Sequence, residues 1–73
     1  MIKEKKREKE TITPRKKLIL EFISKGYKTE DIAKEMGYSL SLIHSELNQM
    51  LKDTETIGRA HLIAWAYQNK ILK

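Results

Sequence analysis

Cysteine is absent from this 73-residue chain, which excludes a disulfide framework and a thiolate metal site. The two histidines, at positions 44 and 61, are too few for a zinc site without other ligands. Proline occurs once and glycine three times, so few residues are suited to turns. Aromatic residues are also few. This composition favours an all-α fold.

Long apolar runs are also missing. No segment approaches the roughly 20 apolar residues of a membrane span, and no apolar signal-peptide core follows the charged N-terminus. We recognise no nucleophile–base pair, carboxylate dyad or phosphate-cradling loop, so we expect neither enzymatic activity nor a cofactor. The expectation is a soluble, cytoplasmic protein without a membrane partner.

Positive charge is in excess, and it is distributed unevenly. The net charge is +5, with an isoelectric point near 9.6, which suits a polyanionic partner. Residues 1–28 hold ten Lys or Arg and four Glu, whereas residues 29–73 hold five Lys or Arg and six Asp or Glu. The N-terminal part therefore carries the positive charge.

The chain divides into a charged segment and one small domain. Residues 1–10, MIKEKKREKE, bury too little apolar surface to offset the entropy of ordering, so we expect a flexible tail. The alternative is a basic arm that lies along DNA phosphates. Residues 11–73 are predicted to form the domain.

Helix signals follow one another through residues 11–73. Thr13 as N-cap and Pro14 begin a first helix, which Gly26 ends in the left-handed conformation. Thr29 is the predicted N-cap of a short second helix, ended by Gly37. The expected core residues of these two helices are Ile19, Phe22, Ile23, Ile32, Ala33 and Met36, and Leu20 flanks the inward stripe of the first helix.

Two further helices are predicted beyond Gly37. Ser39 caps a third, which runs to about Asp53, and residues 53–58 form a polar loop anchored by Ile57. Gly58 precedes a fourth helix, from about Arg59 to Lys70. The expected core residues are Ile43, Leu47, Met50 and Leu51 of the third helix and Leu62, Ile63 and Ala66 of the fourth.

The spacing of Ala33, Gly37 and Ile43 is typical of a helix-turn-helix. A small residue lets the two helices approach, glycine tolerates a positive φ in the turn, and an aliphatic residue locks the second helix inward. A helix held in this way can project into a DNA major groove.

Residues along the whole domain resemble the bacterial LuxR/GerE family of helix-turn-helix proteins. The similarity is carried without a gap over some 60 residues, and the chain has about the length of a free-standing GerE-type member. The matching residues are Thr13-Pro14-Arg15, Gly26, Asp31-Ile32-Ala33, Gly37, Ser39, Ile43 and Arg59. The resemblance implies four helices, with the third reading DNA and the fourth forming a homodimer.

Several positions depart from the family pattern. Lys16 stands where the family usually has glutamate, and Leu42 where it usually has threonine. His44 takes the place of a frequent base-reading lysine, and Glu46 that of a common histidine. If Glu46 faces the groove, phosphate repels it unless it accepts a hydrogen bond from a cytosine amino group.

The first functional hypothesis is a sequence-specific transcription regulator that binds double-stranded DNA. On the third helix, Ser41, His44, Ser45, Asn48 and Lys52 share one face at spacings of three and four. We assign base reading to Ser41, His44, Ser45 and Asn48. Phosphate contacts are assigned to Arg15, Lys28, Thr29 and Lys52. The alternative for this face is a solvated surface without a partner.

A homodimer through the fourth helix is also expected. A stripe of His61, Trp65, Gln68 and Leu72 remains after its core residues are assigned, and an exposed Trp often marks an interface. The alternative for Trp65 is a half-buried residue packed over the end of the first helix.

The second functional hypothesis is a protein-interaction module on the same scaffold, because a fold alone does not determine function. Residues 40–53 carry Glu46 and Asp53 against Lys52, a net of −1, which suits a protein better than DNA. The partner would be a sigma factor, an RNA polymerase subunit or another regulator.

Overall fold

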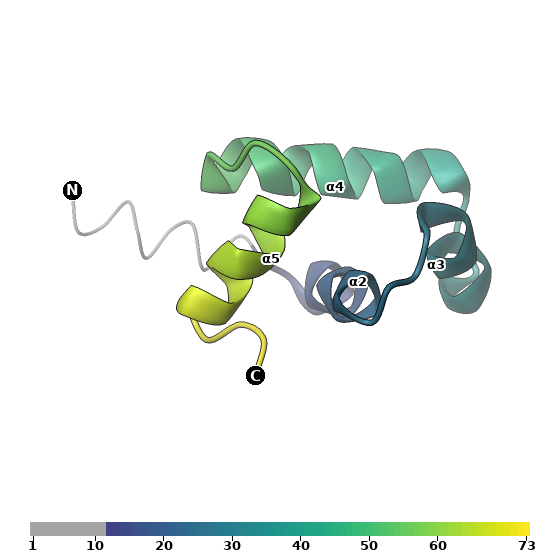
Figure 1. Cartoon of the computed structure of the whole chain (residues 1–73). Coiled ribbons are helices and arrows are strands. Elements are labelled where there is room, and N and C mark those ends of the chain that lie inside the picture. Colours follow the sequence, from purple (N-terminus) through teal and green to yellow (C-terminus); the bar gives the residue numbers. More distant parts are fainter. Residues whose placement is uncertain (1–11) are drawn as a thin grey trace.

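Four helices make up the part of the chain that the computed structural model describes, residues 12–73 (Figure 1). Helix α2 spans Pro14–Ser24, α3 spans Thr29–Met36, α4 spans Leu40–Thr54 and α5 spans Arg59–Gln68. Since residues 12–73 contain no strand, the predicted all-α class is confirmed. None of these helices is long and apolar enough to cross a membrane. The predicted tail or basic arm, residues 1–10, lies outside the described residues.

Helix ends follow the local chemistry of the sequence. The Oγ1 atom of Thr13 accepts a hydrogen bond from the backbone N–H of Lys16 at 3.2 Å, and Ser39 Oγ accepts from Leu42 N–H at 3.1 Å. Gly37 ends α3 with φ of 73°, and the next N–H, of Tyr38, donates to the carbonyl of Ala33 at 2.9 Å. These caps confirm the predicted starts of α2 and α4 and the predicted end of α3.

Other boundaries differ from the prediction. Thr29 is the first residue of α3 rather than its N-cap, which is Lys28 and makes no side-chain capping bond. Helix α4 runs to Thr54, where the hydroxyl donates to the carbonyl of Met50 at 2.8 Å, and Glu55 then takes the left-handed conformation. The predicted loop therefore begins later than residue 53, and α5 ends at Gln68, before Lys70.

Helix α4 is the element that the others share. It packs against α2, α3 and α5, and α2 also packs against α3 and α5. Figure 1 shows α4 along one side of the fold, with the C-terminus on the side away from it. One face of α4 is therefore covered by three helices, and its other face is left to solvent.

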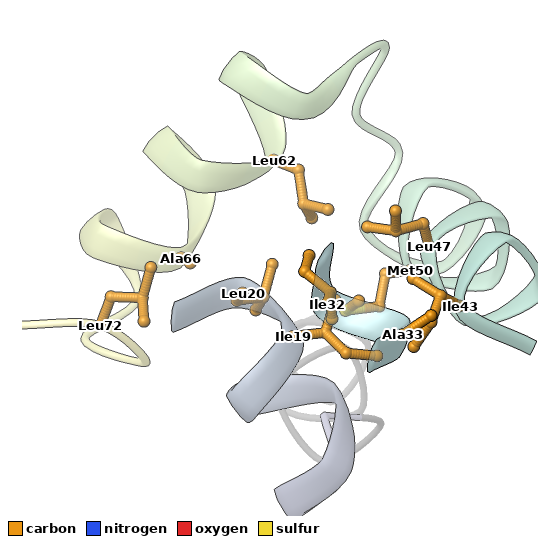
Figure 2. Packing of buried hydrophobic residues seen from close by; sticks show 10 residues of the cluster. All are labelled: Ile19, Leu20, Ile32, Ala33, Ile43, Leu47, Met50, Leu62, Ala66 and Leu72. Atoms are coloured by element: carbon orange, nitrogen blue, oxygen red, sulfur yellow. The ribbon is translucent and has the colours of Figure 1, made fainter. Parts of the chain in front are cut away.

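Buried side chains from all four helices form one core (Figure 2). Its residues are Ile19, Leu20, Ile32, Ala33, Ile43, Leu47, Met50, Leu62, Ala66 and Leu72. The prediction is confirmed at eight of the apolar positions assigned to the core, and Leu20, which was expected to flank them, is fully buried as well. Five others are only partly buried: Phe22, Ile23, Met36, Leu51 and Ile63. Helical spacing in the sequence thus identifies most of the core.

Two residues near α5 contradict the prediction. Ile57, the expected anchor of the loop, is 92% exposed. Leu72, assigned to an outward stripe, is 6% exposed and lies in the core, because the chain reverses after α5 at Lys70, whose φ is 61°. The N–H groups of Ile71 and Leu72 both donate to the carbonyl of Ala66, which fixes the reversal.

Replacing Ile43 with aspartate tests the α3–α4 contact. The fully buried side chain would become an unpaired charge, which costs several kcal/mol and exceeds what a domain of this size can lose. We expect Ile43→Asp to be unfolded by circular dichroism and Ser45→Asp, at an exposed position of the same helix, to stay folded. An unchanged melting temperature in Ile43→Asp would contradict the packing described here.

Replacing Gly37 with alanine tests the turn between α3 and α4. An added Cβ would meet no atom within 4 Å, so the cost arises from the left-handed conformation and is about 1–2 kcal/mol. Gly58 also has open space around it, but its φ of −177° suits any residue, so Gly58→Ala should change stability by less than roughly 0.5 kcal/mol. Urea denaturation measures the free energy of unfolding of both variants. Equal values for Gly37→Ala and Gly58→Ala would refute the argument that the left-handed conformation requires glycine at position 37.

Candidate functional site

Five polar side chains make up the outer face of α4: Ser41, His44, Ser45, Asn48 and Lys52. All five are exposed, and together with Gln49 they line one shallow groove on the protein surface. The exposure predicted from their spacing is therefore confirmed. The four residues assigned to base reading lie side by side in this groove, with Lys52 at one end of the series.

The position of this face follows from the core. Ile43, Leu47 and Met50 recur at three- and four-residue spacing and are buried against the other helices, which fixes the rotation of α4 about its axis. The residues between them must then point outward. The groove is thus held by a rigid helix rather than by a loop.

Glu46 is not part of the outer face. One of its carboxylate oxygens accepts a hydrogen bond from Nη1 of Arg15 at 2.9 Å, and the other lies 3.8 Å from Nζ of Lys16. Only 14% of its side chain is exposed. Glu46 therefore does not point outward with the polar row, and its charge is directed toward the start of α2. Two departures from the LuxR/GerE pattern, Lys16 and Glu46, form an ion pair with each other.

The sequence contained a signal for this position of Glu46. The residue follows Ile43 by three and precedes Met50 by four, which places it on the same side of the helix as the buried residues. Arg15 and Lys16 lie in the first turn of α2, where positive charge opposes the helix dipole, and this turn contains no acidic residue. Glu46 supplies that compensation from α4.

Arg15 keeps an exposed side despite this contact. Its side chain is 44% exposed, and its guanidinium carbon lies 5.0 Å from the centre of the Tyr38 ring, in the turn between α3 and α4. The hydrogen bond to Glu46 and the neighbouring Tyr38 both raise the pKa of Arg15. Arg15 thus links the start of α2 to both α4 and the turn.

Arg59 lies beside α4 at the edge of the outer face away from Glu46 and Arg15. It lines a second hollow together with Leu47, Leu51 and two residues of the outer face, His44 and Asn48. At 100° per residue, His44 and Leu51 lie on one side of the outer face of α4 and Glu46 lies on the other. An arginine therefore flanks the outer face at each edge. Arg59 was not among the predicted site residues, since nothing local in the sequence brings it to α4.

The predicted phosphate contacts have different surroundings. Lys28 and Lys52 are exposed, and Arg15 is partly engaged by Glu46. Thr29 is 8% exposed, and its Oγ1 atom lies 3.4 Å from Nε2 of His44. Burial leaves little of Thr29 for a phosphate, so we correct that assignment: its hydroxyl lies beside His44 instead.

The predicted dimer stripe is only partly at the surface. His61 and Gln68 are exposed, Trp65 is half-buried against the core, and Leu72 belongs to the core itself. Leu72 is therefore not an interface residue of an outward stripe. The exposed face of α5 is formed by Ala60, His61, Ala64, Tyr67 and Gln68.

A second groove lies between α2 and the end of the chain. It is lined by Lys17, Glu21, Ser24, Lys25, Tyr67, Ile71, Leu72 and Lys73. The lining includes three lysines and one glutamate, and Tyr67, which is 47% exposed, lines it with the apolar Ile71 and Leu72. This groove combines positive charge with apolar surface, unlike the outer face of α4.

Metal binding has no support in the part of the chain that is described, where no three histidine or carboxylate side chains gather. Comparison of the chain with protein-family models, with curated proteins and with solved structures gave no match. The functional argument therefore rests on the residues and their arrangement.

Proposed function

We propose that this protein is a sequence-specific DNA-binding transcriptional regulator. In this proposal α3, the turn at residues 37–39 and α4 form a helix-turn-helix of the LuxR/GerE type, with α4 in the major groove of double-stranded DNA. The observation that carries the proposal is the outer face of α4, an exposed row of hydrogen-bonding side chains on a helix whose other face is buried.

The side chains of this face suit the edges of base pairs. The amide of Asn48 can bond to adenine in bidentate fashion, and the hydroxyls of Ser41 and Ser45 can donate or accept. His44 can donate to a guanine acceptor or to a phosphate. Such groups discriminate between base pairs in the major groove, where each pair presents a distinct pattern.

The charges around this face also support a DNA partner. Because Glu46 points toward α2, Lys52 is the one fully charged side chain among the outer-face residues. Arg15 and Arg59 flank the face at its two edges, and exposed Lys28 lies at the start of α3. Phosphates line both sides of a major groove, so cations on both edges of α4 would fix its register.

A dimer through α5 belongs to the same proposal. A two-fold dimer would present two copies of α4 to two half-sites of DNA. The contact would use the exposed face of α5, which includes His61 and Gln68 from the predicted stripe and the small side chains of Ala60 and Ala64. Partly buried Trp65 would contribute its remaining surface.

Asn48→Ala tests base reading. We expect loss of preference at one position of each half-site, at roughly 1–3 kcal/mol, in competition binding with duplexes that vary in sequence. Gln49→Ala is the matched control, because the neighbouring amide of Gln49 already donates to Asp53 Oδ1 at 2.9 Å. An unchanged base preference in Asn48→Ala would reject α4 as the reading helix.

Ala64→Glu tests the dimer. The side chain is exposed, so the domain should remain folded while the added charges oppose each other across a two-fold α5 contact. Sedimentation should give a dimer for the wild type and for Ser45→Glu, an exposed control on α4, and a monomer for Ala64→Glu. A wild-type monomer at high micromolar concentration would refute dimerisation through α5.

A second candidate function is binding of another protein through the groove between α2 and the chain end. Lys17, Lys25 and Lys73 beside Tyr67 and Ile71 suit an acidic segment with an apolar side chain, on a sigma factor, polymerase subunit or regulator. A gel shift with nonspecific duplex DNA at low salt separates the two functions. Binding favours the first, and its absence favours the second.

A further inference from the structure

Glu46 holds two cations that would otherwise face solvent beside the outer face of α4. Its carboxylate bonds to Arg15 at 2.9 Å and lies 3.8 Å from Lys16, and the Lys16 side chain is only 15% exposed. Both cations come from the first turn of α2, and Glu46 comes from the middle of α4. The single carboxylate of Glu46 is thus paired with both Arg15 and Lys16 at this edge of α4.

The contact leaves Arg15 able to exchange partners. The hydrogen bond to Glu46 uses the Nη1 end of the guanidinium, the Tyr38 ring lies 5.0 Å from its central carbon, and nearly half of the side chain is exposed. A guanidinium has five N–H donors, so phosphate oxygens can approach those that Glu46 leaves free. The negative charge of Glu46 offsets part of the attraction between this cation and a phosphate, so the two anions compete for Arg15 electrostatically.

We propose that Glu46 is an internal competitor for DNA phosphate that sets the specificity of the α4 site. This inference rests on the proposed DNA-binding function. Phosphate contacts are independent of sequence and supply nearly all nonspecific affinity. By occupying Arg15 and Lys16, Glu46 lowers affinity for every duplex, so that the base contacts of α4 decide where the protein stays bound.

Glu46→Gln is the variant that tests this role. Glutamine keeps the shape and an acceptor oxygen but loses the charge, which releases Arg15 and Lys16 for phosphate. We expect severalfold tighter binding to random duplex at low salt. The plot of log affinity against log salt should steepen by about one to two units, as expected for one or two added phosphate contacts. Discrimination between operator and random duplex should fall.

Asp53→Asn is the matched control for charge alone. Asp53 lies seven residues, about two turns, beyond Glu46 on the same side of α4, and among the described residues its carboxylate accepts from Gln49. Its neutralisation removes one negative charge without releasing Arg15 or Lys16. The expected gain in affinity and in salt slope is therefore clearly smaller than for Glu46→Gln.

A comparison in a variant that lacks both cations completes the test. In an Arg15→Gln, Lys16→Gln background, Glu46→Gln has no cation to release, so its gain should disappear; circular dichroism confirms that each variant is folded. The proposal is overturned if Glu46→Gln equals Asp53→Asn, if its gain persists in that background, or if it weakens binding, which would make Glu46 a support for Arg15.

The failure of this inference can be told apart from failure of the proposed function. If wild-type protein does not bind duplex DNA at low salt, the proposed function fails, and the inference fails with it. If the wild type binds with a base preference that Asn48 controls, and Glu46→Gln behaves as Asp53→Asn, only the competitor role of Glu46 is rejected.

Discussion

The burial of one side of α4 is the constraint on which the rest of this structure depends. Ile43, Leu47 and Met50 give α2, α3 and α5 a common surface to pack against, and the first and last of these are fully buried. The buried residues of the described part of the chain, residues 12–73, form one cluster, so no second core there replaces that contact. Since the inner side of α4 is fixed, its outer face is fixed as well, and the polar groove is a consequence of the packing.

Ion pairs between Glu46 of α4 and the first turn of α2 add to this packing at one edge of α4. Arg15 and Lys16 stand where the dipole of α2 disfavours them, and Glu46 offsets their charge from a neighbouring helix. The same contact removes an acidic charge from the outer face, where it would oppose a polyanion. In the structure, Glu46 therefore bears on the proposed DNA binding through Arg15 and Lys16, and not by facing the DNA itself.

The sequence predicts the features that depend on local spacing. Thr13, Ser39 and Gly37 mark helix ends through their own hydrogen bonds or backbone freedom, and the three- and four-residue recurrence along α4 separates its buried and exposed sides. Leu72 was misassigned because a non-glycine residue, Lys70, makes the left-handed reversal that brings it into the core. The place of Arg59 beside His44 and Asn48 depends on how α5 packs against α4, which no local pattern encodes.

The central claim is that the outer face of α4 binds duplex DNA. Nuclear magnetic resonance titration of the labelled protein with duplex DNA tests it most directly, because the spectrum reports on backbone amides throughout the chain at once. The account predicts the largest shifts at Ser41, His44, Ser45, Asn48 and Lys52, with smaller ones at Arg15 and Arg59. Shifts concentrated at Lys17, Lys25 and Tyr67, in the groove between α2 and the end of the chain, would contradict it, as would the absence of shifts at low salt.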